Sequence, residues 1–491
     1  MITNKGGTGE LQDHRHWTLD QLVGHYRPSL ERVYKDHVAR LVKTYGAAAE
    51  QTGFEAIVLD TGIQNYYFAD DRGILFAPTP HFAHWVPLAT AGHILVVGGG
   101  RKPILCVYAP KDYWHEDPSY LVDGVDGKSY RITGAFQDHL DVSSDLYDIR
   151  VFGEAKDLVK EVIAAVGTAP AALVGPLRDA FKDLGWADNP RNLLARLDWN
   201  RTTKTEYELL CLWIAQGSGV RGHREVFDLF KQGDLHELDL HLRFLKGAGI
   251  SEDSVPYGSI VALNERGRIL HYQYKKTTRE PLRTLLIDAG SRFRGYPSDI
   301  TRTYAGPHAS RAFCDIMADM ERRQLGFVAQ LAIGKSFVDM HQLAHRGLGE
   351  LLVEHGVIQG ITAEGAVASG ITRVFFPHGL GHHLGIQVHD VGSKQSDPEG
   401  TELKAGEDIP GGRYLRNIRP LAEGHVVTIE PGLYFIPMLI EEAMSGPHRQ
   451  HLNQSLIKDL MPHGGIRIED DIYMTAQGPL NLTRKSFACH T

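Results

Sequence analysis

A chain of 491 residues, 42% of them hydrophobic and 23% charged, is long enough to build two domains with full cores. Its net charge of −8, without any stripe of basic residues, argues against nucleic acid as a partner. The longest apolar runs fall far short of the roughly 20 residues that span a bilayer, so we expect no membrane segment.

The four cysteines are widely spaced and form no CxxC pair, a pattern typical of reduced thiols. The first residues are polar and lack the apolar core of a signal peptide. We therefore expect a cytoplasmic protein whose residues 1–17 form a flexible tail.

The first part of the chain is predicted to mix strands and helices. Thr18–Gln21 has the pattern of a capping box and predicts a helix up to about Ala48, interrupted at Pro28. Gly98–Gly100 indicates a hairpin turn rather than a phosphate loop, because the lysine-serine pair of such loops is missing. Short apolar runs predict strands at 55–60, 93–97, 103–108, 147–152 and 171–174, with helices near 155–166 and 177–184.

A second capping-box pattern, Thr203–Glu206, predicts a helix that runs to Ala215 or beyond. The polar segment just before it suggests a domain boundary. We predict an N-terminal α/β domain over residues 1–197 and a second domain over residues 198–491, and no internal repeat is evident.

Five residues of metal-ligand type follow in the second domain, in apolar or glycine-rich surroundings: Asp288, Asp299, His382, Glu430 and Glu469. Asp288 ends an apolar run, and Asp299 follows a turn, so a strand, turn and return strand could bring the two carboxylates together. Because side chains alternate along a strand, Thr428 shares a face with Glu430, and Arg467 with Glu469. An arginine beside a carboxylate would orient it or bind an anionic group of a ligand.

His382 belongs to a run from Phe376 to Gly392 that contains four histidines. Its glycines at 379, 381 and 385 would let the backbone come close to a ligand. The run is not the HExxH motif of zinc proteases, because Gly-Leu-Gly separates His378 from His382.

Each of the five residues has an ordinary explanation when taken alone, such as a capping aspartate, a solvated glutamate or a polar histidine loop. Together, four carboxylates in apolar surroundings would be costly to bury without compensation. Two divalent cations would balance their charge. Oxygen ligands with one imidazole favour Mn²⁺, Fe²⁺ or Co²⁺.

With these motifs the chain resembles the pita-bread metallopeptidase family, which includes methionine aminopeptidase, aminopeptidase P and prolidase. Within it, the chain is most similar to the bacterial Xaa-Pro dipeptidases (prolidases), a subgroup that includes the enzymes called organophosphorus acid anhydrolases. Further matching segments are Tyr66–Asp71, Pro110–His115, Tyr257–Asn264 and Arg268–Tyr272.

The resemblance implies an α+β protein with a C-terminal pita-bread catalytic domain and a smaller N-terminal α/β domain. It implies two divalent metal ions, with Mn²⁺ favoured and Co²⁺ or Fe²⁺ as alternatives. Asp288 would hold one metal in a bidentate manner, His382 and Glu430 the other, and Asp299 and Glu469 would bridge them.

The resemblance also implies that a metal-bridging hydroxide hydrolyses dipeptides with a C-terminal proline. Glu430 would carry the proton, His389 would stabilise the developing oxyanion, and His378 and Arg467 would lie beside the proline carboxylate. The substrate pocket would be formed by Tyr257, Leu270, His271, Val388 and His389. In a homodimer, Asp70 or Asp71 of a neighbouring subunit would meet the substrate amine.

A side activity on organophosphate triesters and fluorides follows from the same resemblance. Three other functions remain open. Aminopeptidase P shares the fold and metals but acts on longer peptides. A methionine aminopeptidase would usually lack the large N-terminal domain. A non-catalytic pita-bread binding module would have lost ligands, whereas all five are present here.

Overall fold

The computed structural model describes residues 19–113, 123–124, 129–133, 139–143, 145–176, 178–406, 409–410 and 412–489. The predicted tail at 1–17, together with Thr18 of the first predicted capping box, lies outside these residues. So do Trp114 and His115 of one upstream motif.

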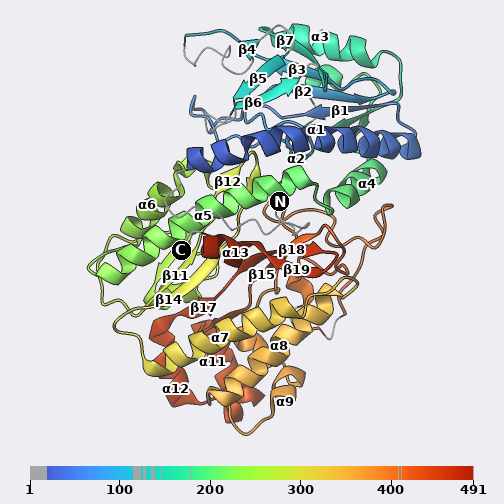
Figure 1. Cartoon of the computed structure of the whole chain (residues 1–491). Coiled ribbons are helices and arrows are strands. Elements are labelled where there is room, and N and C mark those ends of the chain that lie inside the picture. Colours follow the sequence, from blue (N-terminus) through green and yellow to red (C-terminus); the bar gives the residue numbers. More distant parts are fainter. Residues whose placement is uncertain are drawn as a thin grey trace.

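The N-terminal part contains a six-stranded mixed sheet in the order β7-β3-β2-β1-β8-β9 (Figure 1). Its strands are β1 (Ala56–Asp60), β2 (Ile94–Gly98), β3 (Ile104–Tyr108), β7 (Asp148–Phe152), β8 (Ala171–Val174) and β9 (Ala187–Asp188). Strands β4 (Asp123–Gly124), β5 (Ser129–Thr133) and β6 (His139–Ser143) form a separate sheet. The five predicted strands are confirmed, as is the hairpin turn at Gly98–Gly100 between antiparallel β2 and β3.

Alternating side chains of this sheet pack into two hydrophobic cores, one on each face. Val58 and Val96 belong to the cluster that contains Leu158 of α3 (Ala155–Val166). Ile57 and Leu95 belong to the cluster that contains the buried face of α1 (Leu19–Thr52). The strands β1, β2, β3 and β8 are therefore covered on both faces, in keeping with their continuous apolar sequences. Two short helices, α2 (Pro80–Ala83) and α4 (Arg191–Arg201), complete this part.

Three local predictions are wrong. Helix α1 continues through Pro28, whose side chain is exposed; the buried Leu30, Val33 and Tyr34 anchor the helix beyond it. The predicted helix at 177–184 is only a 3-10 turn over Asp179–Phe181. The second capping box begins at Thr205 rather than at Thr203.

The Thr-x-x-Glu spacing occurs twice in this stretch, and the second copy forms the box. Thr205 Oγ1 accepts a hydrogen bond from Glu208 N, and Glu208 Oε2 accepts one from Thr205 N at 2.8 Å. The helix that they open, α5 (Glu206–Gln232), is longer than the minimum predicted. The domain boundary proposed at residues 197 and 198 falls inside α4 and stays a prediction.

The C-terminal part is built from small antiparallel sheets covered by helices (Figure 1). Its strands are β10 (Ile260–Leu263), β11 (Thr284–Asp288), β12 (Arg292–Phe293), β13 (Tyr296–Pro297), β14 (Thr301–Ala305), β15 (Val426–Ile429), β16 (Gly432–Tyr434), β17 (Gly465–Arg467), β18 (Asp470–Thr475) and β19 (Gly478–Asn481). Its other helices are α6 (Glu237–Ala248), α7 (Arg311–Ala329), α8 (Phe337–Glu354), α9 (Ala363–Ala368), α10 (Thr372–Phe375), α11 (Pro437–Ser445), α12 (Gln454–Leu460) and α13 (Leu482–Cys489).

Helix α5 connects the two parts, and Figure 1 shows it running beneath α1. The largest core cluster extends across this contact, from Trp85 through Leu210 of α5 to Tyr296 and Leu384. The N-terminal sheet, the β12–β13 hairpin and the first residue of β15 therefore contribute to one continuous core. None of the described helices combines the length and apolar character that crossing a bilayer requires.

Candidate metal centre

Strand pairing places Asp288 and Glu469 on either side of Thr301. Asp288, the last residue of β11, pairs with Thr301, the first residue of β14. Thr301 also forms a bridge with Glu469, and its hydroxyl donates a hydrogen bond to Glu469 Oε2 at 2.6 Å. The predicted strand, turn and return strand are thus present, and the β12–β13 hairpin forms the turn.

Asp299 lies just before β14 and is fixed through both its side chain and its backbone. Tyr257 donates its phenolic hydrogen to Asp299 Oδ1 at 2.6 Å. Asp299 N donates to Asp471 Oδ2 at 3.0 Å, and Gln216 donates to the same oxygen. The role of the fully buried Asp471 in holding the Asp299 backbone was not predicted from the sequence.

His382 and Glu430 come from segments that lie side by side. Glu430 N donates to Leu380 O at 2.8 Å, and His382 N donates to Thr428 Oγ1 at 3.1 Å. A Cβ atom at Gly381 would overlap with the carbonyl oxygen of Thr428, so this close approach requires glycine. The space beside Gly381 is thus filled by the backbone of Thr428 in the adjacent segment, whereas the sequence analysis predicted that a ligand would lie there. Gly385 lies in the same way against the carboxylate of Asp390.

The imidazole of His382 is oriented toward the carboxylates. Its Nδ1 donates to the backbone oxygen of His383 at 3.0 Å, so Nε2 is the atom that remains for a ligand. That nitrogen lies 3.4 Å from Asp299 Oδ2 and 3.9 Å from Glu430 Oε1. One ligand atom each of Asp299, His382 and Glu469 lie within 4.8 Å of one another, and all three residues are buried.

Arg467 links Asp288 to a second histidine through Tyr434. Its Nη2 donates to Asp288 Oδ2 at 2.7 Å, and its Nη1 donates to the Tyr434 hydroxyl at 3.0 Å. His378 Nδ1 donates to the backbone oxygen of Gly379, so the Tyr434 hydroxyl donates to His378 Nε2 at 2.9 Å. Of the two roles that the sequence left open for Arg467, the structure shows the orienting one, directed at Asp288. Burial, aided by the charge of Arg467, lowers the pKa of His378 to about 3, so this imidazole is neutral.

The carboxylates repel one another. Burial raises the pKa of Asp288, raises that of Glu430 to about 7, and raises that of Glu469 well above its ordinary range. Burial also acts to raise the pKa of Asp299, but the hydrogen bond and charge of His382 outweigh it, so the net shift is downward. Asp288 Oδ1 is buried without a hydrogen-bond partner among the described residues. Divalent cations fit this donor set, because they would satisfy the free oxygen and the excess negative charge.

The predicted pocket residues lie around this centre. The hydroxyl of Tyr257 donates its hydrogen to Asp299. Leu270 packs against the hydrophobic cluster that contains Tyr434, and His271 is exposed. Val388 and His389 line a cavity beside the centre. The ring of His389 lies edge-on to that of His382, with 4.4 Å between the centroids. Burial, followed by the charge of His382, lowers the pKa of His389 to about 4.

The structure does not bring Asp70 and Asp71 to the centre of their own chain. Both are exposed in the turn between Tyr67 and Arg72, where Asp70 Oδ1 accepts a hydrogen bond from Arg72 N at 3.0 Å. Neither forms a hydrogen bond or ion pair with a described residue of the site.

Two further residues of the site were missed by the sequence analysis. Thr301 could have been found, because it lies two residues after Asp299 and alternation places both on one face. Tyr434 follows Glu430 by four residues and passes into another strand, β16, so no periodicity connects the two. Only the tertiary structure brings its hydroxyl to Arg467 and His378.

A second buried group of metal-ligand type, His37, His84 and Glu208, lies between α1, α2 and α5. Hydrogen bonds account for most of it. His37 Nε2 donates to the backbone oxygen of His84 at 2.7 Å, and His37 Nδ1 lies 2.9 Å from the hydroxyl of Thr205. Glu208 accepts the capping bond from Thr205 N. This group therefore joins the two parts of the chain.

Comparisons with known proteins agree with this fold and site. Residues 211–476 match the model of metallopeptidase family M24, and residues 32–199 match that of the Xaa-Pro dipeptidase N-terminal domain. An Xaa-Pro dipeptidase of Marinobacter nauticus is 40% identical over 456 residues, which cover 91% of this chain and 97% of the relative. One of Xanthomonas campestris pv. campestris is 37% identical over 467 residues, covering 94% and 99%.

Among solved structures, aminopeptidase P from E. coli with the inhibitor Pro-Leu superposes with a TM-score of 0.66 at 20% identity, covering 93% of this chain and 98% of the other. The aminopeptidase PepP of Pseudomonas aeruginosa gives the same values. These likenesses establish the pita-bread fold. With both sequence models matched and full-length relatives near 40% identity, the chain belongs to metallopeptidase family M24 and carries an N-terminal domain of the Xaa-Pro dipeptidase type.

Proposed function

We propose that the chain is a two-metal Xaa-Pro dipeptidase that hydrolyses dipeptides with a C-terminal proline. The observation that carries this proposal is the convergence of Asp299, His382 and Glu469 within 4.8 Å, in a buried site that Asp288 and Glu430 complete. The names of the full-length relatives supply the substrate class.

In this proposal Asp288 would help to hold one metal, His382 and Glu430 would help to hold the other, and Asp299 and Glu469 would serve both. The metals are divalent, with Mn²⁺ favoured and Co²⁺ or Fe²⁺ as alternatives. When bound, such ions polarise a carbonyl group and lower the pKa of water to about 7, which provides hydroxide at neutral pH.

The protein side chains then manage protons and charge. Glu430 carries a proton from the attacking water to the leaving nitrogen, a role that a carboxylate beside the reacting atoms can serve. His389, on the cavity side of His382, faces the oxygen on which negative charge develops. His378 and Arg467 mark the side of the proline carboxylate.

The apolar ring of proline suits the remaining pocket. Tyr257 and Leu270 provide its walls, and His271 lies at the exposed edge. We further propose that the enzyme acts in the cytoplasm, a proposal that the four free cysteines support.

We also propose that it forms a homodimer, in which Asp70 or Asp71 meets the substrate amine in the partner's site. The homodimer is supported by the exposure of two large aromatic side chains, Tyr66 and Phe68, in the segment that carries Asp70 and Asp71. Neighbouring exposed aromatic side chains are uncommon on a surface that has no partner.

Removal of metal should destabilise the protein most at alkaline pH. The folded-state pKa of Glu430 is raised from 4.5 to about 7, so in stripped protein its contribution to stability is present below pH 4.5 and lost as pH rises through 7. Glu469 shifts in the same direction. Saturating Mn²⁺ should therefore raise the Tm of EDTA-treated protein by roughly 5 °C at pH 8 and by less at pH 6. Asp299→Asn should reduce this gain, whereas Asp319→Asn, in α7, should not. An equal gain at both pH values would contradict the charge argument.

Hydrolysis of Leu-Pro by stripped enzyme, with and without Mn²⁺, tests the main proposal. We expect Mn²⁺ to restore cleavage of the dipeptide and not of a Leu-Pro-Ala tripeptide. Glu430→Gln should lower kcat at least about 100-fold, because a proton carrier is lost, while the surface change Glu350→Gln should not. Cleavage of the tripeptide would indicate an aminopeptidase P instead, and cleavage of neither would favour a non-catalytic module.

The dimer proposal predicts that Asp70→Ala or Asp71→Ala lowers kcat/KM for Ala-Pro by about 10-fold, the order expected for one lost charged hydrogen bond. Asp183→Ala, another exposed aspartate of the N-terminal part, is the control. Sedimentation should show a dimer for all three variants. If both substitutions leave kcat/KM unchanged, these residues do not reach a substrate.

The same site should also hydrolyse diisopropyl fluorophosphate when metal is bound. A tetrahedral phosphoryl centre resembles the tetrahedral intermediate of amide hydrolysis in shape and charge, so the groups that stabilise one also suit the other. Fluoride release, followed with an ion-selective electrode, should require Mn²⁺ and fall in Glu430→Gln. Absence of metal-dependent fluoride release would refute this side activity.

A further inference from the structure

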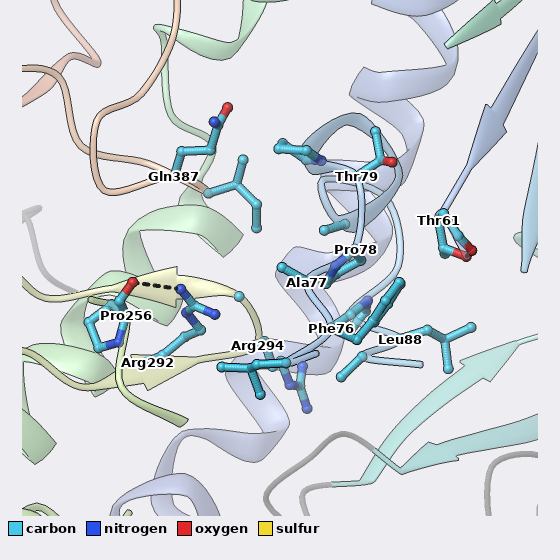
Figure 2. A pocket seen from close by; sticks show the side chains of 18 of the residues that line it. Thr61, Phe76, Ala77, Pro78, Thr79, Leu88, Pro256, Arg292, Arg294 and Gln387 are labelled. Carbon is cyan, nitrogen blue, oxygen red and sulfur yellow. Dashed lines mark hydrogen bonds between the residues drawn. The ribbon is translucent and has the colours of Figure 1, made fainter. Parts of the chain in front are cut away.

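A cavity of about 880 Å³ lies between the two parts of the chain, beside the metal centre. One wall comes from the N-terminal segment 61–89, and the other from the β12–β13 hairpin and residues 386–389 (Figure 2). The cavity meets the centre at Val388 and His389, since the ring of His389 contacts that of His382. The cavity therefore begins one side-chain contact away from the candidate ligand His382.

Most of the cavity wall is apolar and includes Phe76, Pro78, Leu88 and Ile386. Among the described residues that line it, the charged ones are Arg292, Arg294 and Asp253. Arg294 packs its guanidinium over the ring of Phe293, 5.4 Å from the centroid. Asp253 is exposed at the rim. The described lining therefore contains two guanidinium groups and one exposed carboxylate.

Arg292 is held in place at this wall by the hairpin that joins the two aspartates of the centre. It pairs with Pro297 of β13, two residues before Asp299. Its Nη2 donates to the backbone oxygen of Pro256 at 3.1 Å, the dashed line in Figure 2. Because Tyr257 follows Pro256 and bonds Asp299, Arg292 is positioned relative to the reacting centre through rigid neighbours on both sides.

The charge of Arg292 is not balanced within the described part of the chain. Its Nε is buried there without a hydrogen-bond partner, and its guanidinium forms no ion pair with a described carboxylate. Burial lowers its pKa, the sign of a cation taken out of water without compensation. A half-buried charge without a partner has a desolvation cost, and an anion that enters the cavity would recover part of that cost.

We propose that this cavity is the subsite for the residue that precedes proline, and that Arg292 makes it selective for a carboxylate side chain there, glutamate above all. The inference rests on the proposed dipeptidase function. The proline carboxylate is assigned to His378 and Arg467, which do not line this cavity, so the group that reaches Arg292 past Val388 and His389 belongs to the N-terminal residue. The apolar wall accommodates the methylene groups of glutamate, and the guanidinium pairs with its carboxylate.

The test compares kcat/KM for Glu-Pro, Gln-Pro and Leu-Pro with Mn²⁺-loaded enzyme. Glutamate and glutamine have the same size, so the Glu-Pro to Gln-Pro ratio reports charge alone. We expect a ratio above about 10 for the unaltered enzyme, the order of one charged hydrogen bond, and a fall of about 10-fold or more in Arg292→Met. Arg292→Lys should retain part of the preference, and Arg292→Glu should prefer Lys-Pro to Glu-Pro.

Arg221→Met is the matched control. Arg221, in α5, is likewise half-buried with one nitrogen lacking a partner among the described residues, and burial lowers its pKa too, but it lines no part of this cavity. Its ratio should equal that of the unaltered enzyme. Circular dichroism establishes that each variant is folded, and the four substitutions at two positions keep the test decisive if one is not.

The outcomes distinguish failure of the subsite proposal from failure of the proposed dipeptidase function. A high ratio that Arg292→Met abolishes and Arg221→Met preserves supports the subsite. Cleavage of Leu-Pro with a Glu-Pro to Gln-Pro ratio near one, or a ratio that Arg292→Met leaves unchanged, overturns the subsite and leaves the dipeptidase standing. Cleavage of none of the three dipeptides overturns the proposed function and this inference with it.

Discussion

Mutual repulsion among four carboxylates, two of them buried and two largely so, is the constraint on which this site depends. Asp288, Asp299, Glu430 and Glu469 share one interior space, where two like charges a few ångströms apart interact far more strongly than in water. Among the described residues Arg467 is the guanidinium that contacts these carboxylates, and it is bonded to Asp288. The remaining charge requires protons or metal ions, so the same carboxylates that destabilise the bare site create its affinity for cations.

Carboxylates that repel one another stay together only if a rigid framework holds them. Here the framework is backbone hydrogen bonding, because Asp288, Thr301 and Glu469 are adjacent across three paired segments. On the other half of the site, Gly381 allows the His382 segment to lie against β15. Neither arrangement tolerates a shift by one residue, since alternate side chains point to opposite faces.

The N-terminal part contributes space rather than ligands. Its segment 61–89 forms one wall of the cavity beside the centre, and a core shared through α5 keeps that wall in place. The opposite wall carries Arg292 on the short hairpin between Asp288 and Asp299. The residues from 288 to 299, twelve in all, thereby contain both the proposed selectivity residue Arg292 and two candidate metal ligands, Asp288 and Asp299. A substitution that alters the hairpin would therefore affect substrate selectivity and the metal centre together.

The sequence by itself determined the order and type of the five candidate ligands and five of the six strands of the N-terminal sheet, because these depend on residue type and on periodicity within short segments, while the fold class followed from the resemblance of its motifs to a known family. Local pattern failed where two solutions compete nearby, as with the capping boxes at Thr203 and Thr205, or where distant packing overrides a local signal, as at Pro28. Tyr434, Asp471 and Arg292 acquire their roles from partners far away in the chain, at Arg467, at Asp299 and across an interdomain cavity. Only the tertiary structure could decide these, since hydrogen bonds and uncompensated charges arise from distances in space that spacing along the chain does not encode.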